Sequence, residues 1–580
     1  MTKDVRFHGG DELITLVSAK RPVRPRKRLD RGSAIDKGER IGAFICRCGG
    51  AVDRVVDVDA VAAHTSSLGS VAFVEVMDFP CSANGREGIR KAIKDNNLGR
   101  FVVAGCSPRT HERLFRRVAA DAGLNQFMFE IANIREQSAF VHSGPEATRK
   151  AKMLVDAAIA KCRLLFPAPY KQLPISARKV LVVGDGLSAM TAVSCISEQG
   201  GKVVFVTPSP SLEECASAGV YFDAPAESVM RVVRQLKSNR SVRILTGSDV
   251  VEFQGHPGDF RALVETLDGE EDVRCGATIL AFEPTFAPRS GIEDERVVTN
   301  QEFRDSLRRP PYPKRIVIIL PASSTPGMIC ARSDHIGAIA DALRMRELSS
   351  SAEITVVSRD IRADGMHELD YRKAQEHGIR FVRYDEDPII EHEGDLRVLV
   401  NDPCSDSRLI LAADVVVLSG LVSLPNNQKR AKIFGIPIEK NGLFRRTQVR
   451  LEPASTLREG VFVCGGAAGP RLVSEMMIEA SAAATMALSV VKKRYIEIGG
   501  AVAEIDPEKC CVCLTCIRSC PYTAPFVNDE SKAEIDIQTC QGCGICVGIC
   551  PSKAIEMYSY TDDQIDAQSS AMIKGGQDEG

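Results

Sequence analysis

Eight cysteines near the end of the chain form two runs with the same spacing. Each run reads Cys-x2-Cys-x2-Cys-x3-Cys, from residue 510 to 520 and again from 540 to 550, and each ends in Cys-Pro. This spacing is typical of thiolates that hold [4Fe-4S] clusters. A zinc site would need only one such quartet, and a disulfide framework belongs to short secreted chains. The two runs therefore predict a segment that holds two clusters and carries single electrons.

The two runs are expected to exchange a ligand. In bacterial-type ferredoxins with this pattern, the fourth cysteine of each run ligates the other cluster. The spacing leaves Cys511 outside both quartets. The expected ligands of the first cluster are Cys510, Cys513, Cys516 and Cys550, and those of the second are Cys540, Cys543, Cys546 and Cys520.

The bulk properties exclude several classes of protein. A chain of 580 residues should contain several domains, and a hydrophobic fraction of 44% argues against global disorder. A net charge of -2 gives no field for binding nucleic acid or an anionic membrane. No apolar run reaches the roughly 18 residues of a membrane span. Because 20 cysteines occur without an apolar signal-peptide core, we expect a reducing, cytoplasmic location.

Short apolar runs that alternate with helical patterns predict a chain of the α/β class. The basic segment at its start is either a solvated arm or a docking site for an acidic partner protein. In chain order we expect a basic polar arm at 1–39, an N-terminal α/β domain at 40–168, a doubly wound dinucleotide-binding core at 169–500 with a second lobe at about 312–400, an α+β ferredoxin domain with two [4Fe-4S] clusters at 501–560, and a polar tail at 561–580.

Four cysteines of the N-terminal α/β domain follow predicted strands or lie in loops. The carboxyl ends of parallel strands gather at one edge of a sheet, where binding sites form. Four thiols that converge there could hold a further [4Fe-4S] cluster. The alternative is that each is buried as a small hydrophobic residue. The spacing does not decide between these interpretations for Cys46, Cys48, Cys81 and Cys106.

A glycine-rich turn opens the central region. A predicted strand leads into Gly184-Asp185-Gly186 and then into a helix, which is the context of a dinucleotide fingerprint. Gly184, Gly186 and Ala189 would let the backbone approach a pyrophosphate at the helix N-terminus. However, Asp185 places a carboxylate where phosphate charge would lie, and the next strand ends in Thr207 in place of an acid for the ribose. The alternative is a turn with a structural role only, which binds no dinucleotide.

A second glycine-rich turn follows the predicted strand that begins at 460. Gly465, Gly469 and Pro470 lead into an alanine-rich helix from 474 to 491. Turns of this kind let a helix N-terminus meet a flavin or its phosphates. Close packing of a strand against a helix explains the same small residues equally well.

Several segments resemble the A subunit of heterodisulfide reductase and its relatives in anaerobic bacteria and archaea. The segments that carry the resemblance are FICRCG at 44–49, AGCSPRTHE at 104–112, EIANIREQ at 130–137, DIRA at 360–363, YRKA at 371–374 and GVFVCG at 460–465. The resemblance implies a thioredoxin-reductase-like core that binds FAD, a ferredoxin module, and a cluster in the N-terminal domain. The chain departs from the family at Asp185, where the turn usually reads Gly-Gly-Gly, and it lacks the extra ferredoxin insert of the larger members.

The same resemblance implies an oxidoreductase that acts as the electron-transfer component of a multi-subunit anaerobic redox complex. Electrons would pass between FAD, [4Fe-4S] clusters and partner subunits. The expected partners resemble the B and C subunits of heterodisulfide reductase, or form a dehydrogenase or reductase module. Two copies of the chain could also form a homodimer within a larger assembly. Asp185 and Thr207 motivate the alternative, a flavin-less iron–sulfur relay and assembly scaffold that retains the dinucleotide fold. No catalytic acid–base or nucleophilic set is predicted.

Overall fold

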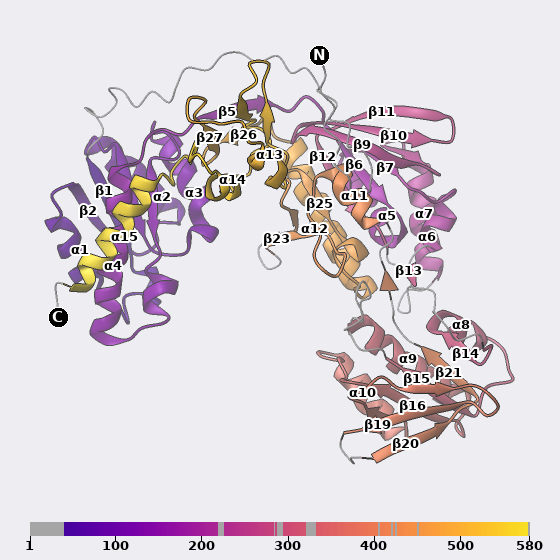
Figure 1. Ribbon diagram of the computed structural model, residues 1–580. Helices are drawn as coiled ribbons and strands as arrows, with labels where there is room; N and C mark the ends of the chain where they lie inside the picture. The colour runs from indigo at the N-terminus through magenta and orange to yellow at the C-terminus, as the bar shows by residue number, and fades with distance from the viewer. Residues whose placement is uncertain are drawn as a thin grey trace.

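The structure is a computed structural model of the chain (Figure 1). It describes residues 40–217, 226–283, 285–286, 294–320, 332–403, 407–418, 422–423, 426–448 and 452–577. The basic arm predicted at 1–39 lies outside these residues. None of the helices described within them has the length and apolar character needed to cross a membrane.

The first part is a four-stranded parallel sheet of order β2-β1-β3-β4, with helices on both faces. Alternate side chains of β1 enter two separate cores. Ile45 packs with residues of α1 and α4, whereas Phe44 packs with residues of α2 and α3. The elements are β1 Ile41–Cys46, η2 Cys48–Gly50, α1 Val58–Ser67, β2 Val71–Met77, α2 Ala83–Asp95, β3 Arg100–Ala104, α3 Pro108–Asp121, β4 Phe129–Ala132, η3 Arg135–Ala139 and α4 Gly144–Arg163.

The central part is built on a seven-stranded sheet of order β23-β24-β25-β12-β6-β7-β8, and the sheet β11-β10-β9 packs beside it. Strands β25, β12, β6, β7 and β8 are parallel. The elements are β6 Lys179–Gly184, α5 Gly186–Glu198, β7 Lys202–Val206, α6 Leu212–Ser217, α7 Ala226–Ser238, β8 Val242–Leu245, β9 Asp249–His256, β10 Asp259–Thr266, β11 Gly269–Cys275, β12 Ala277–Ala281, α11 Asn427–Phe434, β23 Arg446–Gln448, β24 Glu452–Thr456, β25 Val461–Val463, η4 Gly465–Ala468 and α12 Val473–Val491.

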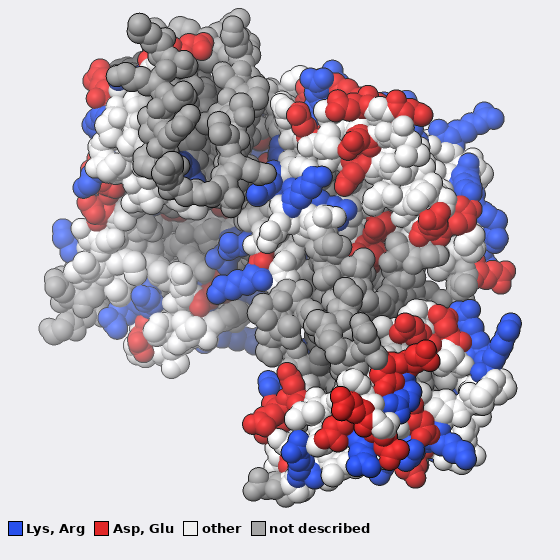
Figure 2. All heavy atoms as spheres, turned by 45° about the vertical axis from the view of Figure 1, so that its right-hand side comes forward, with Lys and Arg blue, Asp and Glu red and all other residues white. Residues whose placement is uncertain are grey.

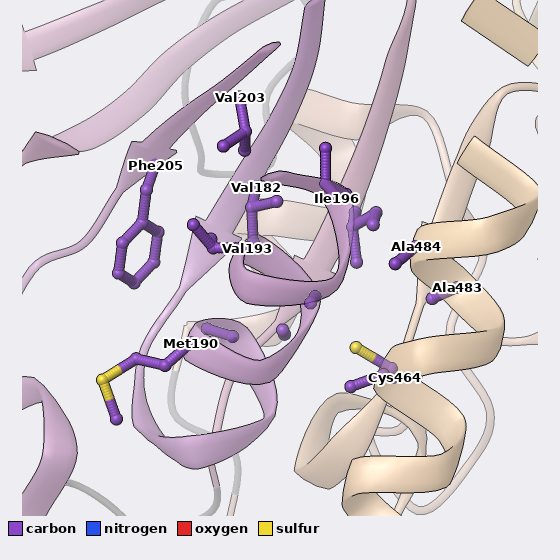
Figure 3. Packing of buried hydrophobic residues seen from close by; sticks show 14 of the residues in the cluster. Val182, Met190, Val193, Ile196, Val203, Phe205, Cys464, Ala483 and Ala484 are labelled. Atoms are coloured by element: carbon purple, nitrogen blue, oxygen red, sulfur yellow. The ribbon is translucent and has the colours of Figure 1, made fainter. Parts of the chain in front are cut away.

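A tightly packed apolar core joins α5 and α12 to this sheet. Val182 and Phe205 of the sheet face Val193 and Ile196 of α5, while Ala484 lies on the facing side of α12 (Figure 3). Because four of the nine buried residues of α12 are alanines, the two helices approach closely. This packing fixes the first turns of both helices at the carboxyl edge of the sheet, where the two glycine-rich turns lie.

The second lobe has its own five-stranded parallel sheet, of order β14-β21-β15-β16-β17. Basic and acidic side chains are interspersed over this lobe, at the bottom of Figure 2. It extends beyond the predicted limits of 312–400, since β14 and β21 add strands from either side. Its elements are β14 Val297–Thr299, α8 Asn300–Ser306, β15 Arg315–Ile319, α9 Arg332–Leu348, β16 Glu353–Ser358, α10 His367–Glu376, β17 Arg380–Arg383, β18 Ile389–Glu391, β19 Arg397–Asp402, β20 Ser407–Ala412 and β21 Val415–Leu418, with a small ribbon of β13 Thr285–Phe286 and β22 Val422–Ser423 between lobe and core.

The chain enters and leaves the central part through one antiparallel ribbon. Strand β5, Tyr170–Pro174, pairs with β26, Tyr495–Gly499. Residues of the ribbon pack with Phe127 of the N-terminal domain and with Ile537 and Tyr558 of the segment that follows. The chain therefore comes back to the N-terminal domain at β26, which follows the central part in sequence.

The cysteine-rich segment folds as two short ribbons, β27–β30 and β28–β29, with two five-residue helices. Residues 562–577, predicted as part of a polar tail, instead form helix α15, which lies along α4 (Figure 1). The Gln564 side chain donates to the Leu164 carbonyl at 2.9 Å. The elements are β27 Ala503–Ile505, α13 Thr515–Ser519, β28 Pro525–Val527, β29 Ala533–Ile535, α14 Ile545–Ile549, β30 Ile555–Met557 and α15 Asp562–Gln577.

Candidate cluster and cofactor sites

The cysteines of the two runs line two separate hollows in the C-terminal segment. The hollows are open to solvent and contain about 320 and about 330 Å³ of empty space, and each contains the fourth cysteine of the opposite run. In each hollow the structure thus brings three cysteines of one run together with the fourth cysteine of the other, as the exchange of ligands requires. The first hollow is lined by Cys510, Cys511, Cys513, Cys516 and Cys550, and the second by Cys520, Cys540, Cys543 and Cys546.

The two halves of the segment reach this arrangement through the same backbone conformations. Val512 and Leu514 have positive φ values of 52° and 62°, and Gly542 and Gly544, at the equivalent positions of the second run, have values of 64° and 76°. Left-handed residues are costly for side chains other than glycine. Their recurrence shows that the loop conformation is required where the chain wraps a hollow.

The thiols of the second hollow act on one another electrostatically. Burial raises the pKa of Cys546 to about 11, and the nearby thiols of Cys540, Cys543 and Cys520 contribute to that rise. Iron binds thiolates, so loading a cluster must release these protons. A cationic iron core among the four sulfurs would replace their mutual repulsion with bonds, and this donor set therefore fits a [4Fe-4S] cluster.

The four N-terminal cysteines converge at the carboxyl edge of their sheet. Cys46 ends β1, and the loops after β2 and β3 carry Cys81 and Cys106. Burial raises the pKa of Cys46 to about 12, and the charges of Cys48, Cys106 and Cys81 act in the same direction. Each of these thiols is therefore close enough to affect the same sulfur. Gly105 permits the approach, because a Cβ there would lie 3.2 Å from the Cys46 Cβ.

A basic side chain completes this group. Arg135, at the start of η3, donates from Nη1 to the Cys106 sulfur at 3.4 Å. The pKa of Cys106 is raised by burial, and the Arg135 hydrogen bond opposes that shift. A guanidinium beside a sulfur favours the thiolate, which is the form that binds metal. Sequence reasoning did not single out Arg135, although it stands in the motif at 130–137.

Among the residues that the structure describes, no group of three or more His, Cys, Asp or Glu is arranged to hold a single metal ion. A cubane is larger than an ion and is held by thiolates around its corners. The hollows of the C-terminal segment, which are lined by several cysteines each, suit a cubane better than a single metal ion. Every described cysteine is a free thiol, so no disulfide competes for these sulfurs.

The glycines of the dinucleotide fingerprint form the tight turn that their pattern predicts. Gly184 has a φ of 152°, and a Cβ there would lie 1.9 Å from the Ala281 carbonyl oxygen. Gly186 has a φ of 73°, and Ala189 is buried in the first turn of α5. The backbone at this position has the form of a dinucleotide-binding turn.

The second glycine-rich turn meets the first only in part. A Cβ on Gly465 would lie 2.3 Å from the Ser188 hydroxyl of α5, so η4 and α5 touch. By contrast, Gly469 faces Leu443, and the Pro470 carbonyl accepts from Arg471. The structure therefore brings Gly465 to the fingerprint turn, while Gly469 and Pro470 lie at the approach to α12.

Two carboxyl groups lie at the fingerprint turn, beside the N-terminus of α5. Asp185 accepts the backbone N–H of Glu283 at 2.7 Å. The Glu283 carboxylate contacts the Ser188 hydroxyl and accepts the Ser188 backbone N–H at 3.4 Å. Burial raises the pKa of Glu283 to about 7, and the charge of Asp185 contributes to that shift. The backbone of this turn fits a dinucleotide, whereas its side chains oppose phosphate charge. Glu283 was missed by sequence reasoning, although it follows a strand ending at this edge.

The chain has relatives that match most of its length. Residues 503–551 match the family described as a 4Fe-4S dicluster domain. The chain is 27% identical to the iron–sulfur A subunit of CoB–CoM heterodisulfide reductase from Methanocaldococcus jannaschii, over 84% of this chain and 90% of that protein. It is also 27% identical to a protein of Archaeoglobus profundus named as similar to the heterodisulfide reductase A subunit, over 93% and 98% of the two chains. The predicted resemblance to this family is confirmed over most of the chain.

Solved structures of thioredoxin reductases are similar to about half of the chain. Thioredoxin reductase of Lactococcus lactis has a TM-score of 0.39 at 16% identity, covering 54% of this chain and 99% of that one. Thioredoxin reductase of T. acidophilum has a TM-score of 0.38 at 15% identity, with 54% and 98% covered. The predicted α/β fold class is confirmed by the parallel sheets of the structure and by the matched dicluster domain.

Replacing a cysteine in the first hollow tests the ligand register. We expect Cys513→Ala to lose one cluster, about four iron atoms per chain, because it removes one of four thiolates. Cys511→Ala is the matched control, since Cys511 lines the same hollow and is exposed like Cys513 but falls outside the ligand spacing. Iron and sulfide analysis of anaerobically purified protein measures both. Iron loss in the control would overturn the register.

The N-terminal thiols can be tested in the same way. We expect Cys106→Ala to lose about four iron atoms per chain and to leave the C-terminal clusters in place. Cys195→Ser is the control, because Cys195 is a free thiol in the central part. An iron content equal to that of the parent in Cys106→Ala would contradict a cluster at this edge.

Proposed function

We propose that this chain, which resembles the A subunit of heterodisulfide reductase over most of its length, is the electron-transfer component of a multi-subunit redox complex. The observation that carries the proposal is the pair of hollows in which each run supplies its fourth cysteine to the other. Ligands exchanged between runs make one rigid unit of two clusters, and such a unit transfers electrons singly. The relatives are named as reductase subunits, which supports an oxidoreductase.

The clusters are assigned to three groups of thiols. The first two groups are the quartets of the C-terminal hollows, each with an exchanged fourth ligand. The third consists of Cys46, Cys48, Cys81 and Cys106, supported by their convergence at one sheet edge and by the Arg135 hydrogen bond to Cys106. Reduction potentials follow from burial and from hydrogen bonds to sulfur, so Arg135 would raise the potential of its cluster.

FAD is the proposed partner of the clusters within the chain. When bound, it exchanges a two-electron equivalent for single electrons. The residues that would hold it are Gly184, Gly186 and Ala189 at the start of α5, with Gly465, Gly469 and Pro470 before α12. The backbone turn at Gly184 supports this assignment, while Glu283 and Asp185 oppose the phosphates.

A flavin-less relay is the second candidate, and one observation favours it. The Glu283 carboxylate already accepts the Ser188 N–H at the N-terminus of α5. In such a relay the clusters alone conduct, and the nucleotide fold serves to hold partners. Both candidates place the chain among redox subunits in a reducing cytoplasm, which free thiols throughout the described residues support.

The experiment is anaerobic purification of the tagged chain from its native host, with the co-eluting proteins identified. We expect other redox subunits to co-elute and the absorption spectrum to bleach on reduction. A chain that elutes alone, without reducible clusters, would refute the proposal. Flavin released on denaturation, near one per chain, would reject the flavin-less relay, whereas broad iron–sulfur absorption without flavin would reject the FAD assignment.

A further inference from the structure

We infer that Glu283 and Asp185 form an internal carboxylate pair that takes the place of a flavin pyrophosphate at the start of α5 and weakens the binding of FAD. The inference rests on the proposed function only for the identity of the ligand. It assigns to two residues of this chain the control of whether the central part carries a flavin.

The Glu283 carboxylate lies at the N-terminus of α5. The first backbone N–H groups of a helix have no partner within the helix and attract anions. Here the Ser188 N–H points at Glu283 Oε1 at 3.4 Å, and the Ser188 hydroxyl contacts the same oxygen. The Gly466 backbone of η4 also favours the ionised form of Glu283, because it lowers the pKa of that carboxyl group. The donors of Ser188 are therefore directed at a side chain of the protein itself.

Glu283 is held in place by Asp185. Asp185 is the N-cap residue of α5 but makes no side-chain cap bond. Its Oδ1 instead accepts the N–H of Glu283 at 2.7 Å, across 98 residues of sequence. Asp185 thus fixes the backbone from which the Glu283 side chain reaches α5. The two acids work as a pair, in which one positions the other.

The gap between η4 and α5 is narrow. A Cβ on Gly465 would lie 2.3 Å from the Ser188 hydroxyl and 3.4 Å from Glu283 Oε1. Between η4 and α5 there is therefore not even room for a methyl group. Glu283, with only 5% of its surface exposed, fills the gap that a phosphate would need. A dinucleotide has to displace this side chain as well as overcome its charge.

The ionisation of Asp185 and Glu283 depends on their burial and on nearby charges. Burial is the main cause of the raised pKa values of both acids, and the charge of Asp185 disfavours ionisation of Glu283. Two buried thiols, Cys215 and Cys464, also interact with Glu283. The charge of Arg430 lowers the pKa of Asp185, and the charge of Asp249 raises it. Ionised Glu283 repels a pyrophosphate, and neutral Glu283 does not. Affinity for FAD should therefore increase as the pH falls through about 7.

The test is titration of the full-length, cluster-loaded chain with FAD, followed by flavin fluorescence and by equilibrium dialysis. Glu283→Gln removes the charge and nearly keeps the shape. We expect it to bind FAD at least about tenfold more tightly than the parent and to lose the pH dependence of the parent. Asp185→Asn should tighten binding as well. Glu252→Gln is the matched control, because Glu252 is an exposed acid on β9, and it should behave as the parent does.

Equal FAD affinity in the parent and in Glu283→Gln would overturn the inference, and so would the absence of binding in both carboxyl variants. Iron content and circular dichroism of each variant show whether it is folded, and Asp185→Asn provides the comparison if Glu283→Gln is not. The proposed function fails differently, through loss of reducible clusters or of partner subunits. Neither of those readouts depends on Glu283.

Discussion

The pairing of β5 with β26 is the interaction on which the rest of the arrangement depends. These strands are more than three hundred residues apart in the sequence, yet Tyr170 pairs with Gly499 and Pro174 with Tyr495. The pairing closes the central part into a loop that starts and ends at the same place. It therefore sets the cysteine-rich segment against the N-terminal domain, although the two are at opposite ends of the described chain.

Three further contacts stabilise this juxtaposition. Phe127 and Tyr558 share one apolar core with the ribbon, and Cys540 of the second hollow packs against that core. The Lys161 ammonium lies 4.2 Å from the centre of the Tyr560 ring and 2.7 Å from the Glu130 carboxylate. Helix α15 then lies along α4. The two parts of the chain that carry candidate clusters are thus one body, and the nucleotide fold is inserted between them in sequence.

The sequence predicted best those features that depend on neighbouring residues. The strand over 202–206 and the helix from 474 to 491 are present as β7 and α12, because an apolar run and an alanine-rich pattern are local signals. The two cysteine runs could be grouped in advance because cluster ligation imposes a fixed spacing. The four N-terminal cysteines needed the sheet, since only the parallel strand ends bring them together.

Features that depend on distant contacts could not be predicted. Asp185 was recognised as out of place in its turn, but its partner Glu283 lies 98 residues away and meets it only through the pairing of β6 with β12. Helix α15 looked like a polar tail, because the surface against which it packs belongs to α4, some four hundred residues earlier. The lobe limits missed β14 and β21 for the same reason, as each joins a sheet from beyond the predicted range.

If the N-terminal domain and the C-terminal segment both hold clusters, electrons can pass between them within one chain. A reductive titration of the anaerobically purified chain, with electron paramagnetic resonance used to count the spins of reduced clusters, measures this number. We expect signals that integrate to about three [4Fe-4S] clusters per chain. A total of about two or fewer, at full reduction of a fully iron-loaded protein, would contradict it.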